Sequence, residues 1–385
     1  MSIDLNKKPR YQQIAHAIHE QVRAGILKAG DKLPSERELC DTWQASLITV
    51  RRSLLELAKA GVVVTRQGVG SFVASATPAE PSTNDSHGLL GVVIPAASDY
   101  HNGRVLSALE QSARRLGYSL IIKQSGNTPQ GEAESMSLLA ERNVMGVLIA
   151  PIAGDTSQTV LSCAKLLTSK IPFVLMDRYL PLLNVPYVTI DNVRGGYEVT
   201  RHLVEAGHRK IAYLRGIASS SADDREKGYR QALVEAGLEP HIEVVGNQQY
   251  EMACARERFA SFLDRSQGDV TAVFAENDGF ARAVYDVCRE RGLRIPEDLA
   301  VAGFDDAPYS ALLMPSLTTV VQPYVQIAHR AMTLLIELIH GKTPATTQVI
   351  LPPGLVVRES TGGGRSSAEV QYVQSSEDEL DSGSV

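Results

Sequence analysis

The chain has 385 residues, of which 44% are hydrophobic and 21% charged, and its formal net charge is −6. This composition is typical of a folded protein with two or three domains, and it excludes a positive coat over the whole molecule. No apolar run reaches the roughly 18 residues of a membrane helix, and the start MSIDLNKKPRYQQ lacks the apolar segment of a signal peptide. The four cysteines form no C-x-x-C motif. We therefore expect a cytoplasmic protein without a membrane partner, a metal centre or a cofactor.

Charge is distributed unevenly along the chain. Residues 1–75 contain eleven Lys or Arg and seven Asp or Glu, a net charge of +4, so residues 76–385 carry −6 − 4 = −10. A total charge can hide a local basic patch. A basic head on an acidic body indicates that any contact with nucleic acid is confined to the head.

The first 75 residues predict three helices followed by a β-hairpin. Apolar residues recur at every fourth position in 11–27, which is typical of an amphipathic helix. The motif S-E-R-E at 35–38 is a capping box and predicts the start of a second helix. A third helix is expected from a cap at Ser46 to a left-handed stop at Gly61. The segments 62–65 and 71–73 flank a glycine-containing turn and predict a short hairpin.

The third predicted helix has an apolar and a polar face. Three apolar side chains point inward: Val50, Leu54 and Leu57. Thr49, Arg51 and Arg52 are left near its exposed N-terminal half. The N-terminal residues of a recognition helix enter the major groove of DNA, so these side chains are candidates for base and phosphate contacts.

This head resembles the winged helix-turn-helix of the GntR family of bacterial regulators from residue 9 to residue 73. The resemblance implies that Arg37 contacts phosphate or base, that Thr49 and Arg51 line the major groove, and that the wing enters the minor groove. The full candidate DNA-binding set is Arg10, Arg37, Ser46, Thr49, Arg51, Arg52, Gln67 and Gly68.

The recognition segment departs from the family pattern at one position. Where the family usually has Ser-Arg, this chain has Ser46-Leu47. A bidentate contact between arginine and guanine is worth about 1–3 kcal/mol of discrimination. Either the operator differs at this position or the affinity for DNA is lower.

A connector separates the head from an α/β body. The segment ASATPAEPSTNDSH, at 74–87, is poor in large apolar residues and reads as exposed. We divide the chain into a DNA-binding domain at 1–75, a linker at 76–87, a two-lobed effector-binding and dimerisation domain at 88–361, and a disordered acidic tail at 362–385. Apolar runs alternate with helical patterns in the body and predict parallel strands at 89–94, 118–122, 144–150, 172–176, 210–214, 270–275 and 299–304.

The body resembles the LacI family of repressors and the periplasmic sugar-binding proteins over about 89–359. The matching text is VTIDN at 188–192, REKGY at 225–229, IPEDLAVAGFDD at 295–306 and LTTV at 317–320. The resemblance implies a type I periplasmic-binding-protein-like fold, with two Rossmann-like lobes and parallel sheets. A GntR-type head on a LacI-type body is similar to the arabinose-repressor type of transcription regulator.

The resemblance also implies a small effector between the lobes, at the C-terminal ends of the strands, where open α/β sheets bind ligands in general. Carboxylates, amides and guanidinium groups hold vicinal hydroxyls in fixed geometry, which suits a sugar. The candidate effector-binding set is Asp99, Tyr100, Asp177, Arg178, Arg225, Tyr250, Asn277 and Asp305, with Asn102 as a further contact beside Tyr100.

Polar residues at strand-to-helix junctions have a second interpretation, because an Asp or Asn there is often only an N-cap. We interpret Asp191, Asn192 and Asp278 as caps. Arg225 is expected to open a helix and to contact ligand. Asp305 is followed by Asp306, so one of these carboxylates is available for something other than capping.

Together these features predict a repressor of a carbohydrate-utilisation operon that binds double-stranded operator DNA as a homodimer. The apolar helix 324–339 is a candidate for the dimer interface, although such a stripe also suits a core. The alternatives are a sugar-binding protein without a regulatory role and an α/β enzyme. The sequence has no P-loop, no G-x-S-x-G and no G-x-G-x-x-G opening a helix after the first strand of the body, so we expect no catalytic residues.

Overall fold

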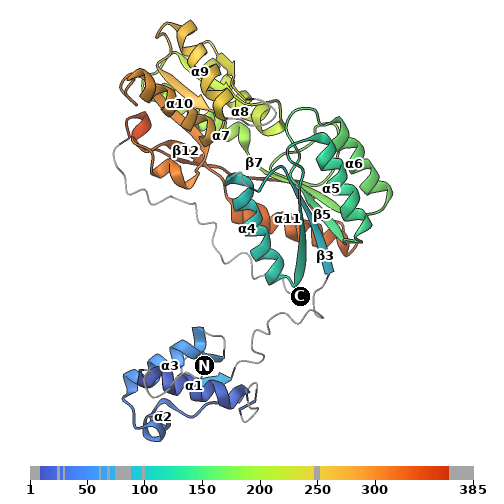
Figure 1. The fold of residues 1–385 in the computed structure, drawn as a ribbon, viewed down its shortest axis with the longest axis vertical. Helices are drawn as coiled ribbons and strands as arrows, with labels where there is room; N and C mark the ends of the chain where they lie inside the picture. Colours follow the sequence, from blue (N-terminus) through green and yellow to red (C-terminus); the bar gives the residue numbers. More distant parts are fainter. Residues whose placement is uncertain are drawn as a thin grey trace. The chain divides into compact units, whose positions relative to one another are not determined.

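The computed structural model describes residues 9–23, 27–28, 31–59, 62–66, 70–73, 88–97, 100–246 and 252–363. The chain divides into two compact units, Met1–Ser86 and His87–Val385, which we call the head and the body (Figure 1). Within the described ranges, no helix is both long and apolar enough to cross a bilayer.

The head is a winged helix-turn-helix. It consists of α1 (Arg10–Arg23), α2 (Glu36–Trp43), α3 (Leu47–Lys59), β1 (Val63–Arg66) and β2 (Gly70–Val73). The predicted capping box is present at α2, where the Ser35 hydroxyl accepts from the N–H of Glu38 and the Glu38 carboxylate accepts from the N–H of Ser35. The first helix is shorter than predicted, since Leu27 lies outside it.

The core of the head is built by the predicted apolar faces. Its buried side chains are Ile14, Ile18, Leu33, Leu39, Val50, Leu54, Leu57, Val62, Val63 and Val73. β1 pairs antiparallel with β2 and brings Val63 opposite Val73, so the base of the wing closes against the helices. This packing fixes α3 on the head and leaves its other face exposed.

The first lobe of the body is a fully parallel six-stranded sheet in the order β13-β7-β6-β5-β3-β4. Its strands are β3 (Gly88–Ile94), β4 (Tyr118–Gln124), β5 (Gly146–Ile149), β6 (Phe173–Met176), β7 (Tyr187–Ile190) and β13 (Gln348–Leu351). Its helices are α4 (Tyr100–Arg115), α5 (Pro129–Glu141), α6 (Ser157–Thr168) and α11 (Tyr324–Ile339). Alternate strand residues pack against α4 and α11 on one face of the sheet and against α5 and α6 on the other.

The second lobe repeats this plan with the sheet order β14-β12-β11-β10-β8-β9. Its strands are β8 (Ile211–Arg215), β9 (His241–Val244), β10 (Ala272–Ala275), β11 (Ala300–Asp305), β12 (Thr318–Val321) and β14 (Gly354–Val356). Its helices are α7 (Asn192–Glu205), α8 (Ser220–Glu235), α9 (Met252–Ser266) and α10 (Asp278–Arg291), with short 3-10 turns at Pro308–Ala311 and Glu359–Thr361. The edge strand β14 runs antiparallel to β12. The sequence predicted a parallel sheet, so the prediction is wrong for this one strand.

All seven predicted strands form, and the described part of the body contains five further strands that the apolar runs did not predict. Three of these, β9, β13 and β14, are edge strands, and most of their side chains are half-buried or exposed. The other two contain threonine, since β7 reads YVTI and β12 reads TTVV. Pairing with neighbouring strands in the two sheets makes strands of these segments.

The chain crosses between the lobes three times, after β7, after β12 and after β13. The second crossing leads into α11, whose apolar stripe is buried against the sheet of the first lobe: Ile327, Ala331, Leu334 and Leu335. This stripe is therefore core, which is the second of the two interpretations given above for this helix. The three crossings form the hinge between the lobes.

The backbones of α7 and α8 approach each other closely at Gly196 and Gly228, where neither helix leaves room for a Cβ atom. A Cβ atom on Gly228 would lie 2.0 Å from the carbonyl oxygen of Val193, which no side chain permits. The close approach fixes the position of Arg225, one turn earlier on α8.

Candidate functional site

The exposed face of α3 carries the predicted arginines. Arg51 forms an ion pair with Glu36 on α2, with 2.9 Å between Nε and Oε2, and its side chain is 63% exposed. The Arg52 guanidinium lies 4.3 Å from the centre of the Tyr11 ring. An ion pair this exposed contributes at most about 1 kcal/mol, so Arg51 can exchange its carboxylate for a phosphate at little cost.

The other candidates in the head have mixed surroundings. Arg37 is exposed on α2. The Ser46 hydroxyl accepts from the N–H of Thr49 and therefore caps α3 as predicted. The Arg10 guanidinium donates to the carbonyl oxygen of Trp43 and thereby links α1 to the end of α2. Gln67 and Gly68 lie outside the described residues.

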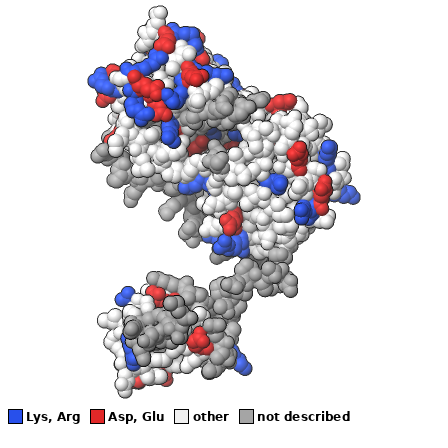
Figure 2. Space-filling view, viewed as in Figure 1, with Lys and Arg blue, Asp and Glu red and all other residues white. Residues whose placement is uncertain are grey.

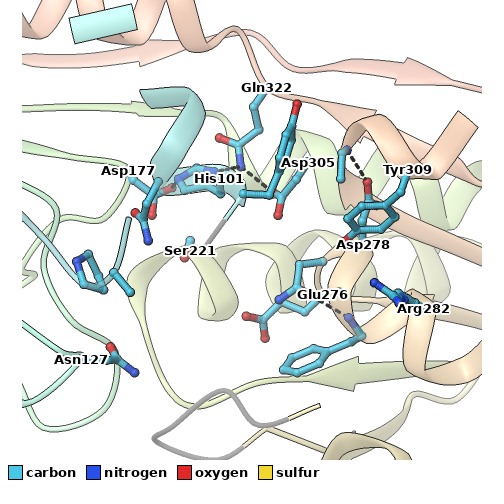
Figure 3. A pocket seen from close by; sticks show the side chains of 18 of the residues that line it. His101, Asn127, Asp177, Ser221, Glu276, Asp278, Arg282, Asp305, Tyr309 and Gln322 are labelled. Carbon is cyan, nitrogen blue, oxygen red and sulfur yellow. Dashed lines mark hydrogen bonds and ion pairs between the residues drawn. The ribbon is translucent and has the colours of Figure 1, made fainter. Parts of the chain in front are cut away.

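In the body, a cavity of about 620 Å³ lies between the two lobes (Figure 3). This volume suits a small-molecule ligand. The predicted effector contacts that line it are Tyr100, Asn102, Asp177, Arg178, Arg225, Asn277 and Asp305. Asp99 and Tyr250 lie outside the described residues. Both lobes contribute, because the C-terminal ends of their parallel strands face each other.

Arg225 is the most constrained of these side chains. It lies within α8, which begins at Ser220, so the expectation that it opens a helix is wrong. Its Nη1 donates to the carbonyl oxygen of Glu276 at 2.7 Å, and its guanidinium carbon lies 3.6 Å from the centre of the Phe304 ring. Its Nη2 lies 3.7 Å from Oδ1 of Asp305. These contacts hold a buried positive charge at the wall of the cavity.

The structure corrects two of the predicted caps and confirms the third. Asp191 caps α7 by accepting from the N–H of Arg194. The neighbouring Asn192 instead accepts from Nε of Arg225 at 2.9 Å, so it orients the guanidinium. At α10 the cap is Asn277, and Asp278 is not the cap that we expected. Sequence alone cannot tell which of two adjacent polar residues occupies the cap position.

Asp278 is at the centre of a buried hydrogen-bond network. Its carboxylate accepts from the hydroxyls of Ser310 and Thr319, both at 2.6 Å, and from the N–H of Ala307. Burial raises the pKa of Asp278 to about 7, and the nearby Asp305 carboxylate adds to this. The network ties α10, β12 and the turn after β11 together beneath the cavity.

Asp305 and Asp306 have different partners, as their adjacency suggested. The Asp306 carboxylate pairs with Arg358 at 2.7 Å. Oδ1 of Asp305 accepts from Nε2 of Gln322 at 2.6 Å. Burial raises the pKa of Asp305, against the opposing effect of Arg225 and His101. Asp305 has a φ of 105°, a left-handed backbone conformation that turns its side chain at the end of β11 toward the cleft.

Asp177 marks the opposite wall, at the end of β6 in the first lobe. Nε2 of His101 lies 3.2 Å from its Oδ1, and Nε of Arg178 lies 3.6 Å from its Oδ2. Burial by itself would raise the pKa of Asp177, but His101, Arg178 and Arg225 outweigh burial and hold the pKa well below its usual value. Asp177 therefore presents a stable carboxylate to the cavity.

Sequence reasoning missed the residues that connect the two walls. His101 contacts Asp177 through Nε2, and its Nδ1 lies 3.4 Å from Nε2 of Gln322, which in turn donates to Asp305 (Figure 3). His101 stands between Tyr100 and Asn102, which were both singled out, and Gln322 follows the LTTV motif at the second crossing. The closeness of His101 and Gln322 to these sequence features is the signal by which they could have been predicted. Other missed lining residues are Asn127, Ser221, Arg256, Glu276, Arg282 and Tyr309.

The cavity is lined by acidic, basic and uncharged polar side chains. Glu276 is buried and accepts from the N–H of Gly216, and burial raises its pKa. In the part of the chain that the structure describes, no cluster of His, Cys, Asp and Glu could hold a metal ion. Outside the cavity, basic and acidic side chains are mixed over α9 and α10 on the face seen in Figure 2. The mixture of acidic, basic and uncharged polar groups inside the cavity suits an uncharged ligand with many hydroxyl groups.

Two family models match the chain in the same two units. Residues 10–73 match the bacterial regulatory proteins of the gntR family, and residues 200–361 match the periplasmic binding protein-like domain. The HTH-type transcriptional regulator DegA of Bacillus subtilis is 33% identical over 275 residues, covering 71% of this chain and 80% of DegA. The arabinose metabolism transcriptional repressor of Geobacillus stearothermophilus is 29% identical over 92% of this chain and 98% of its own length.

Solved structures agree with these matches. The transcriptional regulator CelR in complex with cellobiose is 26% identical and has a TM-score of 0.64, over 82% of this chain and 92% of that one. The expected fold class, a GntR-type head with a two-lobed α/β body, is confirmed. The chain therefore belongs to the family of DNA-binding transcription regulators that join a GntR-type helix-turn-helix to an effector-binding, periplasmic-binding-protein-like body.

Proposed function

We propose that this protein is a repressor that binds double-stranded operator DNA as a homodimer and that responds to a sugar bound between its lobes. The observation that supports a sugar as the ligand is the pair of opposed polar walls of the cavity. Asp177 lies on one lobe, and Arg225 and Asp305 lie on the other. Hydroxyl groups both donate and accept, so one sugar can satisfy a carboxylate and a guanidinium together.

The relatives support the choice of ligand class. One is named for arabinose metabolism, and another was solved with cellobiose. Buried charges that already have partners are pre-oriented, so a neutral polyol binds without reorganising them. A single head contacts too few base pairs for high specificity, and two heads on adjacent half-sites are the usual solution for helix-turn-helix proteins.

The first experiment separates the two activities. The full-length protein is used to select an operator from random duplexes, and a panel of pentoses, hexoses and disaccharides is then titrated by calorimetry. We expect at least one sugar to bind and to weaken operator binding. A protein that binds a sugar but no duplex would instead be a solute-binding protein, and conversion of a sugar into product would indicate an enzyme.

Single substitutions assign the activities to the two units. Arg51→Ala should weaken operator binding at least tenfold and leave sugar affinity unchanged, since it removes a charged contact on α3. Asp305→Asn should leave operator affinity intact and weaken sugar binding. Arg201→Ala removes an exposed arginine paired with Glu205 on α7 and is the matched control for Arg51. Equal loss of both activities in either variant would contradict the assignment.

A further inference from the structure

The outer face of α3 carries exposed aliphatic side chains as well as arginines. Ile48 is 80% exposed, Leu55 is 55% exposed and Leu47 is 42% exposed. In the described part of the head, the large apolar side chains that are exposed all belong to this one helix. Isolated exposed apolar residues are ordinary, but three on a single helix mark a surface that contacts something.

Helical geometry places Ile48 among the predicted DNA contacts. Arg51 and Arg52 follow Ile48 by three and four residues, so the three side chains share a face. Val50 and Leu54, on the opposite face, are buried in the head core. Ile48 therefore adds little to the packing of the head, and its side chain extends from the first turn of α3 together with that of Leu47.

The neighbouring charges favour a nucleic acid as the occupant of this surface. Arg51 and Arg52 are exposed beside Ile48, Arg37 is exposed on α2, and residues 1–75 carry a net charge of +4. A helix N-terminus adds partial positive charge at the same end. An apolar patch within a positive surface matches the major groove of A·T-rich DNA, where thymine methyl groups lie between phosphate backbones.

We propose that Ile48 and Leu47 read thymine, by packing against its C5-methyl group in the major groove. This inference rests on the proposed function, because it requires that α3 enters the groove. It assigns the sequence preference of the first turn of α3 to apolar contact, while Arg51 and Arg52 supply charge. A·T pairs are then expected in each half-site at the positions facing this turn.

The test uses the full-length protein and the operator selected above. Each thymine of a half-site is replaced in turn by uracil, which differs only in lacking the methyl group. Removal of one buried methyl-sized group should weaken binding about fourfold at one or two positions. The Ile48→Ala and Leu47→Ala variants should bind the thymine and uracil duplexes equally at those positions.

Leu55→Ala is the matched control on the same helix. It lies two turns from the N-terminal end, so it should keep the thymine preference. Unchanged circular dichroism would show that each variant is folded. Equal binding of thymine and uracil duplexes by the wild-type protein, or a preference that survives both substitutions at the first turn, would overturn the inference and leave the proposed function standing. Failure to select any duplex would overturn both.

Discussion

At the scale of single residues, the cavity holds carboxylates whose pKa values are shifted in opposite directions. The pKa of Asp177 is lowered by His101 and the arginines, whereas burial raises the pKa of Asp278 and Asp305. A protonated Asp278 removes a negative charge from beside Asp305.

This difference predicts a pH dependence of stability. The pKa of Asp278 rises from its usual 3.8 to about 7 in the folded protein, so its stabilising contribution is complete below about pH 4 and is lost as the pH rises toward 7. Asn in place of Asp278 keeps the shape and does not ionise. Between pH 5 and pH 8, the melting temperature of the wild type should fall by about 3 °C or more relative to that of Asp278→Asn, in scanning calorimetry.

Between pH 5 and pH 8, Asp177 does not contribute to the expected change in stability. The pKa of Asp177 is lowered, so its contribution is present above about pH 4 and is lost only in more acidic solution. If the melting temperatures of the wild type and Asp278→Asn change equally between pH 5 and pH 8, Asp278 is ionised in the folded protein throughout this interval, and the prediction is wrong.

At the scale of elements, the lobes are joined by hydrogen bonds on one side of the cleft as well as by the hinge. The N–H of Gly154 donates to the carbonyl oxygen of Ala218 at 2.8 Å. The N–H of Tyr179 donates to the Ser220 hydroxyl, and the Tyr179 hydroxyl donates to Oδ2 of Asp224, both at 2.9 Å. Any rotation that opens this side of the cleft must break these bonds.

We therefore expect Tyr179→Phe to weaken sugar binding about three- to tenfold, because a hydrogen bond to a charged group that favours the closed lobes is lost. Tyr197→Phe is the matched control, since its hydroxyl donates to Glu235 at 2.7 Å within the second lobe alone. Calorimetry on both variants measures the effect. Identical sugar affinities for the two variants would contradict a role of the Tyr179 bond in closure.

At the scale of the whole molecule, the proposed function requires coupling between two compact units, each with its own core. Coupling between two binding sites is reciprocal by thermodynamic necessity. If the sugar weakens operator binding tenfold, the operator must weaken sugar binding tenfold, which corresponds to about 1.4 kcal/mol.

The reciprocal experiment measures sugar affinity with and without saturating operator duplex, at one fixed salt concentration because DNA binding depends on salt. We expect the two ratios to agree. Duplex of unrelated sequence is the control and should change sugar affinity less. A sugar that alters operator affinity while the operator leaves sugar affinity unchanged would show that the binding sites are not linked through one equilibrium.

The sequence by itself determined the order of the domains, the capping box at α2, the buried face of α3 and the main strands, because each depends on local periodicity or on residues adjacent in the chain. It also indicated which polar side chains follow the strands.

Only the tertiary structure decided what those side chains contact. Asn192 binds Arg225, Asp278 anchors a network beneath the cavity, and His101 with Gln322 joins the two walls. These partners are up to 221 residues apart, so no local pattern encodes them. The short strands β7 and β12 and the buried face of α11 were likewise decided by packing, which sets burial by the neighbours that folding brings together.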